Sequence, residues 1–121
     1  MIKINDKSIY VIMYHYVHPK KNNNYFPALE LTEFKKQINY FQKIGRIIDN
    51  EEFINIINNK KFDSKPNFLL TFDDGYKDHY DYVYPYLKKR NITGNFYVPT
   101  SIWNKNKILD INKIHLILNK E

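Results

Sequence analysis

Two short apolar runs place the strongest constraint on how this chain can fold. Residues 8–14 and 67–72 are rich in aliphatic and aromatic side chains, and neither run alternates apolar with charged positions. A strand of this composition is typically buried on both faces, as in a parallel sheet that helices cover. The two runs therefore predict an α/β fold.

The stretch after the first run predicts a loop and then a helix. Residues 20–27 are polar and rich in asparagine, which is typical of an exposed loop. From 32 to 45 apolar residues recur with helical spacing, with Thr32 as the expected N-terminal cap and Gly45 as the stop. A brief strand at 46–48 is expected to follow.

Two further helices are predicted in the middle of the chain. Asp49 and Glu52 have the spacing of a capping box, which opens a helix that runs to about residue 59. Residues 76–90 also have a helical pattern. Pro85 must interrupt this pattern or begin a new short helix, because proline is tolerated only in the first turn.

The last part of the chain adds one strand and one helix. Residues 93–98 are an expected strand, and Asp110 is expected to cap an amphipathic helix that carries His115 on its apolar face. Alternating strands and helices indicate right-handed βαβ units on a parallel sheet. With 121 residues and no internal repeat, the chain is expected to form a single domain.

The composition excludes several kinds of site and partner. The chain has no cysteine, so it can have neither a disulfide framework, nor a thiolate metal site, nor a cysteine nucleophile. Lysine and arginine number 19 against 13 aspartates and glutamates, a net charge of +6. The lysines are scattered, however, and Arg46 and Arg90 are the only arginines, so nucleic acid is not an expected partner.

The sequence contains no pattern of a membrane span or an export signal. The apolar run near the N-terminus, residues 9–14, is six residues long, which is too short for either. We therefore expect the chain as written to be cytoplasmic and without a transmembrane segment. Association with the cell envelope is compatible with this expectation.

The residues that follow the two buried strands are candidates for chemistry. His15 follows the first strand, and Asp73 and Asp74 follow the second. The carboxyl ends of parallel strands meet at one rim of the sheet, so the three side chains are expected there. Adjacent carboxylates repel unless they point apart or share a cation or proton, and one solution is a metal ligand beside a general base. The simplest alternative is a tight turn, which Asp and Gly favour.

Two strings of residues resemble a known family. TFDDGY at 71–76 resembles the first motif of the polysaccharide deacetylases, the NodB homology family of carbohydrate esterases, and MYHYV at 13–17 is similar to the Tyr-His opening of one deacetylase branch. The resemblance extends from residue 9 to about 103. It departs at Gly94 and Asn95, where small and hydroxyl residues are more usual.

The resemblance implies a fold, an activity and roles for four residues. The fold is the N-terminal half of a distorted (β/α) barrel of the glycoside hydrolase/deacetylase type. The activity is the removal of N-acetyl or O-acetyl groups from a glycan with a divalent metal, often zinc. Asp73 resembles the general base that deprotonates the metal-bound water, and Asp74 the carboxylate ligand of the metal. His15 and Tyr76 are candidates for lining the pocket, although His15 is equally expected as a hydrogen-bonded histidine at a strand end.

The family's other metal ligands have no counterpart in the sequence. They form an H-x-x-x-H pair downstream of the first motif, whereas His79 and His115 are 36 positions apart, and His15 and His18 lie upstream. His79 is expected on the solvated face of its helix and His115 is expected to be packed.

The length suggests that the domain is incomplete. Barrels of this type usually need about 200 residues or more, and the strand at 93–98 would form an open sheet edge. We therefore expect a single, incomplete deacetylase-like domain over residues 1–121, inactive as this chain alone. The remaining metal ligands would lie outside the chain, and a second chain is a potential partner that completes the barrel.

Two other functions stay open on the sequence. An acidic cluster after a buried strand also occurs in phosphoryl-transfer domains, but receiver domains carry an acidic pair after the first strand, which here ends in His15. The other alternative is a non-catalytic glycan-binding remnant. Its sugar-stacking residues would be aromatic: Tyr14, Tyr16, Tyr25, Tyr76, Tyr80 and Trp103.

Overall fold

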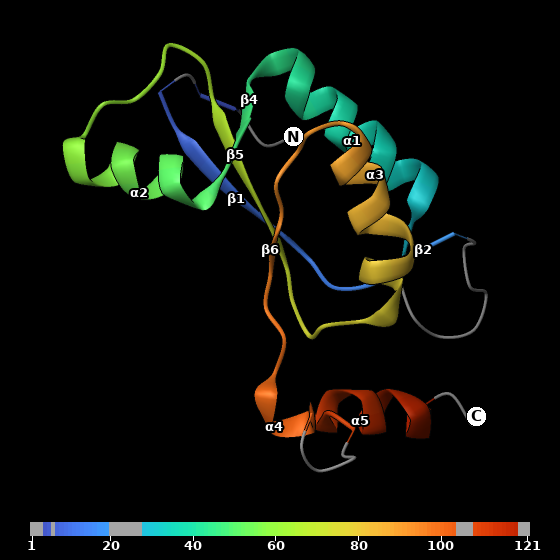
Figure 1. The fold of residues 1–121 in the computed structure, drawn as a ribbon. Helices are drawn as coiled ribbons and strands as arrows, with labels where there is room; N and C mark the ends of the chain where they lie inside the picture. The colour runs from blue at the N-terminus through green and yellow to red at the C-terminus, as the bar shows by residue number, and fades with distance from the viewer. Residues whose placement is uncertain (1–3, 6, 20–27, 104–107, 119–121) are drawn as a thin grey trace.

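Four parallel strands form the centre of the structure, and helices lie on both sides of them (Figure 1). The structure is a computed structural model that describes residues 4–5, 7–19, 28–103 and 108–118, so the loop expected at 20–27 lies outside the described residues. The α/β class is confirmed. In chain order the elements are β1 (Ile9–Tyr14), β2 (Val17–His18), β3 (Leu29–Glu30), α1 (Leu31–Ile44), β4 (Arg46–Ile48), α2 (Asn50–Asn59), β5 (Asn67–Phe72), the π-helical turn η1 (His79–Val83), α3 (Tyr84–Lys89), β6 (Asn95–Phe96), α4 (Thr100–Trp103) and α5 (Asp110–Leu118).

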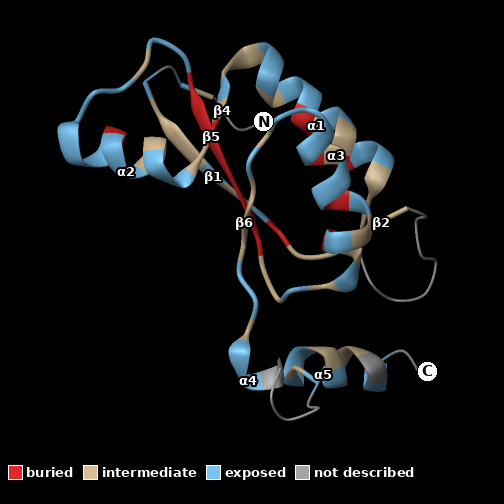
Figure 2. Cartoon of the chain, viewed as in Figure 1, coloured by how far each residue is buried: buried red, intermediate tan, exposed pale blue. Residues whose placement is uncertain are grey.

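Strand β5 is the central strand because it pairs along both of its edges. One edge pairs with β1 over its full length, ending with Tyr14 opposite Phe72. The other edge pairs with β4 at its start, up to Ile48 opposite Leu69, and with β6 at its end, where Phe72 lies opposite Phe96. All six residues of β5 are buried, as the apolar run predicts (Figure 2). The strand expected at 93–98 is confirmed over its two central residues, Asn95–Phe96.

The larger core lies between the sheet and the helices α1 and α3, which cover the same side of it (Figure 1). Alternate residues of β1 and β5 point toward these helices, since side chains of a strand alternate between faces. Aromatic rings fill much of the space. The fully or nearly buried members of this core are Tyr14, Val17, Phe34, Ile38, Leu70, Phe72, Val83 and Leu87.

The opposite face of the sheet is only partly covered. Helix α2 packs there through Ile56 against Ile48 and Leu69, near the start of the strands. Toward the other end of β1, Val11 and Met13 are exposed, Met13 to 61%. The sheet therefore has one complete hydrophobic core and one half-open face.

Several helix boundaries follow local chemistry. The Asp49 carboxylate accepts a hydrogen bond from the Glu52 N–H at 2.8 Å, which confirms the predicted capping box. Pro85 lies in the first turn of α3, and the helical pattern at 76–90 is divided there into η1 and α3. Gly45 ends α1, and a Cβ there would lie 2.1 Å from the carbonyl oxygen of Pro66. This close approach requires glycine.

The predicted start of α1 is wrong by two residues. The helix begins at Leu31, and its N-cap is Glu30 rather than Thr32. Thr32 lies inside the first turn of the helix, where its hydroxyl donates a hydrogen bond to the Glu30 carboxylate at 2.7 Å. Among the helices that the structure describes, none has the length and apolar character needed to cross a bilayer.

Candidate active site

The acidic pair lies at the carboxyl end of β5, where the ends of three strands meet. The Asp73 N–H donates to the Tyr14 carbonyl at 2.9 Å, and the Tyr97 N–H donates to the Phe72 carbonyl at 2.8 Å. These bonds hold the chain after β5 between the ends of β1 and β6. The backbone that carries the two carboxylates is therefore held in place at the rim of the sheet.

The turn after the pair uses two left-handed backbone conformations. Asp74 has φ +68° and Gly75 has φ +61°. Aspartate is one of the few residues with a side chain that tolerates this region, and glycine adopts it without steric cost. At Gly75 there is also no room for a side chain, since a Cβ would lie 2.9 Å from Val98 Cγ1. The structure thus contains the tight turn that Asp and Gly predict. Both candidate carboxylates lie at this turn.

The two carboxylates have different neighbours. Asp73 Oδ2 lies 3.9 Å from His15 Nε2, and both side chains are partly exposed. Asp74 Oδ2 instead accepts a hydrogen bond from the Tyr76 hydroxyl at 3.2 Å. The pair is therefore divided between a histidine on one side and a phenol on the other, which is how adjacent carboxylates avoid sharing one environment.

Tyr76 is a neutral donor in this arrangement. Burial raises the pKa of its phenol above the ordinary value, and the hydrogen bond with Tyr16 and the charge of Asp74 raise this pKa further. The hydroxyl therefore keeps its proton across the neutral range and can donate it to a carboxylate.

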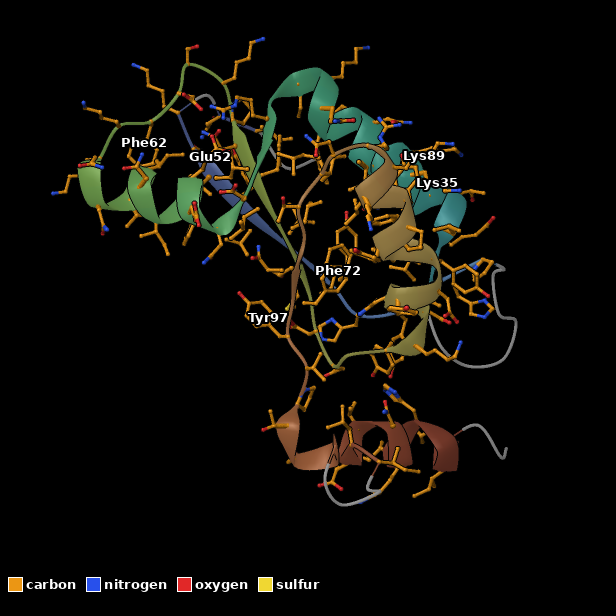
Figure 3. All side chains as sticks on the ribbon, in the orientation of Figure 1. Lys35, Glu52, Phe62, Phe72, Lys89 and Tyr97 are labelled. Carbon is orange, nitrogen blue, oxygen red and sulfur yellow. The ribbon has the colours of Figure 1, made fainter. Side chains whose placement is uncertain are left out.

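An open hollow lies in front of the pair. Its volume is about 500 Å³, and it is lined by Asp73, Asp74, Phe96, Tyr97, Val98 and Pro99. Tyr97 lies on the half-open side of the sheet, whereas Phe72 lies on the side of α1 and α3 (Figure 3). A second hollow of about 540 Å³ lies beside η1 and α3 and contains neither aspartate. The hollow that contains the two carboxylates is therefore the candidate active-site pocket.

The structure corrects the predicted position of His79. This residue is 3% exposed rather than solvated, because η1 packs it under the rim against the rings of Phe72 and Phe96. Its Nε2–H donates to the carbonyl of His15, while Nδ1 has no hydrogen-bond partner among the described residues. The spacing of His79 with Val83 is one helical turn, a signal that places it on the apolar face.

His79 makes stability depend on pH. Burial lowers the pKa of its imidazole, and this outweighs the opposing hydrogen bond to the His15 carbonyl. Below the ordinary histidine value of 6.5, the unfolded chain then binds a proton more readily than the folded chain, so the free energy of unfolding falls as the pH falls from 6.5 toward the folded pKa.

Urea unfolding at pH 7.5 and pH 5.5 measures this effect. We expect the stability difference between the two pH values to shrink in His79→Gln, which keeps a side-chain donor for the His15 carbonyl. The matched variant His18→Gln changes a partly exposed histidine and should keep the difference. An unchanged difference in His79→Gln would show that other groups cause the pH dependence.

The described residues do not fit a complete metal centre. In the ranges that the structure describes, no group of three or more His, Cys, Asp or Glu side chains could hold a metal ion. Asp74 offers one carboxylate, and His15 and His18 do not join it in such a group. Zinc in proteins takes three or four ordered protein ligands, so these residues supply at most part of a site.

Three residues near Asp74 were not predicted from the sequence. Tyr16 and Asn112 form hydrogen bonds with Tyr76, and His115 Nδ1 lies 3.2 Å from the Tyr16 hydroxyl. His115 is half-buried, and its ring lies against that of Tyr16 with the centroids 6.1 Å apart. No local pattern predicts these contacts, because Asn112 and Tyr16 are 96 positions apart.

A family match covers the region of this site. Residues 60–115, which include β5, the acidic pair and most of α5, match the family model for polysaccharide deacetylase. This region is similar to part of a polysaccharide deacetylase domain, and the sequence resemblance to this family is confirmed. No curated protein matches the chain.

Solved deacetylase structures have the same fold over part of their length. IcaB from Ammonifex degensii is 29% identical with a TM-score of 0.65, over 78% of this chain and 39% of IcaB. A de-N-acetylase from Aggregatibacter actinomycetemcomitans is 25% identical with a TM-score of 0.69, over 84% of this chain and 42% of that protein. The match thus spans less than half the length of each of these two structures.

A third structure supports the fold alone. The Streptococcus pyogenes deacetylase PplD, solved in complex with acetate, is 24% identical with a TM-score of 0.69. The match covers 93% of this chain and 51% of PplD. The expected arrangement, the first part of a deacetylase-type α/β barrel, is confirmed by these three matches.

Proposed function

We propose that this chain is part of a hydrolase that removes acetyl groups from a carbohydrate, acting on the C–N bond of N-acetyl sugars. The observation that carries the proposal is the Asp73–Asp74 pair, which opens into a hollow beside His15 within a segment of the deacetylase family. The substrate is an acetylated glycan or sugar. The 121 residues form one incomplete domain of this kind, and a second chain or the rest of a longer chain completes the barrel.

Asp73 is the proposed general base. It is partly exposed at the hollow, where a water molecule can reach both its carboxylate and a bound acetyl group. The water oxygen bonds to the acetyl carbonyl carbon as Asp73 takes a proton from it. The tetrahedral intermediate then collapses, the C–N bond breaks, and the proton that Asp73 took from the water passes to the departing sugar nitrogen, so that the free amine and acetate are released. His15 lies beside Asp73 and is a proposed pocket residue through this approach to the carboxylate.

Asp74 is the proposed carboxylate ligand of a divalent metal, which by family resemblance is zinc. A bound metal of this kind polarises the carbonyl and activates water. Because the described residues do not complete a metal centre, its remaining ligands belong outside this chain. Tyr76 contacts this carboxylate through its hydrogen bond, and it lines the second hollow, beside η1 and α3.

The alternative of a glycan-binding remnant loses part of its proposed surface. Tyr14 is buried between the sheet and α1, where it contacts the rings of Phe34 and Phe72, so it cannot stack on a sugar. Tyr25 lies outside the described residues, and the side chain of Trp103 is likewise not described. No contact in the described part of the chain favours this alternative over hydrolysis.

Acetate release from N-acetylglucosamine oligomers tests the proposed function. We expect no release by the 121-residue chain alone, even with added zinc, because the described residues lack a complete ligand set. The longest gene product that contains this chain should release acetate, and chelation should stop it. Release by the short chain would contradict its proposed inactivity, and no release by the longer product would contradict the proposed function.

A further inference from the structure

We propose that Tyr76 is a positioning residue for the Asp74 carboxylate and that Tyr16 and Asn112 hold Tyr76 in place. The inference rests on the proposed function, because it assigns these residues to the same site. The inference also makes α5 part of that site, because this helix supplies Asn112. The helix lies beyond the carboxyl ends of the strands, next to the rim (Figure 1).

The geometry is a cluster of short hydrogen bonds around one hydroxyl. The Tyr76 oxygen lies 3.2 Å from Asp74 Oδ2, 2.7 Å from the Tyr16 hydroxyl and 2.9 Å from Asn112 Oδ1. Tyr16 also lies 3.0 Å from Asn112 Oδ1. The rings of Tyr16 and Tyr76 pack together with their centroids 4.3 Å apart. Three distant segments of the chain therefore converge on the carboxylate.

The number of protons limits how this cluster can be arranged. An ionised Asp74 carboxylate and the Asn112 amide oxygen can only accept hydrogen bonds, whereas each phenol has one proton to give. When Tyr16 donates to Asn112 or to the Tyr76 oxygen, the Tyr76 proton is left for Asp74. Asn112 Oδ1 and His115 Nδ1 are thus two acceptors within reach of the Tyr16 proton, and either one leaves the Tyr76 proton for the carboxylate.

The consequence is a fixed separation of the acidic pair. Asp73 and Asp74 are adjacent, and two carboxylates repel unless their environments differ. A neutral donor on Asp74 holds this carboxylate on the α5 side of the turn, while Asp73 stays beside His15. The division of labour proposed for the pair is then set by Tyr76 and its two partners, and not by the backbone turn alone.

Carboxyl ¹³C NMR of the 121-residue chain labelled in its aspartates tests this inference without an activity assay. Tyr76→Phe removes only the hydroxyl and keeps the ring contact with Tyr16, so we expect the Asp74 carboxyl signal to move while the Asp63 signal stays. Asn112→Leu should move the same signal. The matched control is Tyr80→Phe, which makes the same change on a ring that is 75% exposed and should move neither signal.

Each outcome decides part of the inference. An unmoved Asp74 signal in Tyr76→Phe would overturn the positioning role, and an unmoved signal in Asn112→Leu alone would remove α5 from the site. If Asn112→Leu does not fold, Tyr16→Phe replaces it, because it also removes one member of the hydrogen-bond cluster.

Kinetics of the longest active gene product supply a second measurement. Partners of this kind typically contribute about 10-fold to 100-fold to activity. We expect Tyr76→Phe to lower kcat by about that factor with little change in KM, and Tyr40→Phe, on a ring of α1 that is 51% exposed, to change neither. An unchanged kcat in Tyr76→Phe would overturn the role in catalysis. If no product is active, the proposed function fails, and the NMR result still decides whether Tyr76 positions Asp74.

Discussion

Replacing Asp73, the proposed general base, by asparagine is expected to lower the turnover number of the proposed deacetylase by about 10²-fold to 10⁴-fold, the usual contribution of such a base. Asparagine has nearly the same shape but cannot take a proton from water at neutral pH. The backbone N–H of residue 73 would keep its bond to the Tyr14 carbonyl, since that bond does not involve the side chain. The loss should therefore appear in kcat and not in folding.

The measurement is acetate release by the longest gene product, with thermal unfolding of each variant in parallel. Asp63→Asn is the matched control, because Asp63 pairs with Arg46 on the surface, away from the rim. This variant should keep its turnover. Retention of most of the activity in Asp73→Asn, in a protein that unfolds at the same temperature, would remove Asp73 from the role of base.

Replacing Phe72 by alanine is expected to lower the free energy of unfolding by about 3–5 kcal/mol, the usual cost of removing a buried phenylalanine ring. Phe72 is 0% exposed at the end of β5. Its ring stacks on Phe96 with centroids 4.7 Å apart and on Tyr14 at 5.2 Å. The loss would leave a cavity where three strands meet, directly before Asp73.

Urea unfolding monitored by circular dichroism measures this loss. Phe62→Ala is the matched control, because Phe62 is 43% exposed and lies outside both cores (Figure 3). Exposed positions of this kind usually change stability by less than about 0.5 kcal/mol. An equal decrease in the free energy of unfolding in Phe72→Ala and Phe62→Ala would mean that the aromatic cluster around Phe72 is not the main source of stability at the rim.

The sequence predicts the parts of the fold that depend on local patterns. An apolar run without alternation predicts that β5 is buried on both faces, and a pair of residues three apart predicts the start of α2 at Asp49. The predicted N-cap of α1 is wrong because the helix begins two residues earlier, at Leu31, with Glu30 as an N-cap whose side chain makes no capping hydrogen bond. A pattern of preferred capping residues does not predict such a start.

The candidate site also has one part that the sequence predicts and one part that only the tertiary structure shows. Asp73, Asp74 and Gly75 are contiguous, so their strand-end position follows from the sequence. The cluster that holds Asp74 requires Tyr16 and Asn112 to meet across 96 positions, and only the tertiary fold determines this contact. The prediction of a solvated His79 is wrong because the helical spacing of this residue with Val83 places it on the apolar face, against Phe72 and Phe96.

Pairing along both edges of β5 also sets how the site opens. A strand that is hydrogen-bonded on two sides and covered by side chains on both faces exchanges its amide hydrogens only in the largest unfolding events, whereas short edge strands and terminal helices open locally at lower cost. The acidic pair is attached to the most protected strand of the sheet. Local opening of α5 or β6 therefore leaves the backbone of the acidic pair attached to β5, whereas opening of α5 also removes the Asn112 partner of Tyr76.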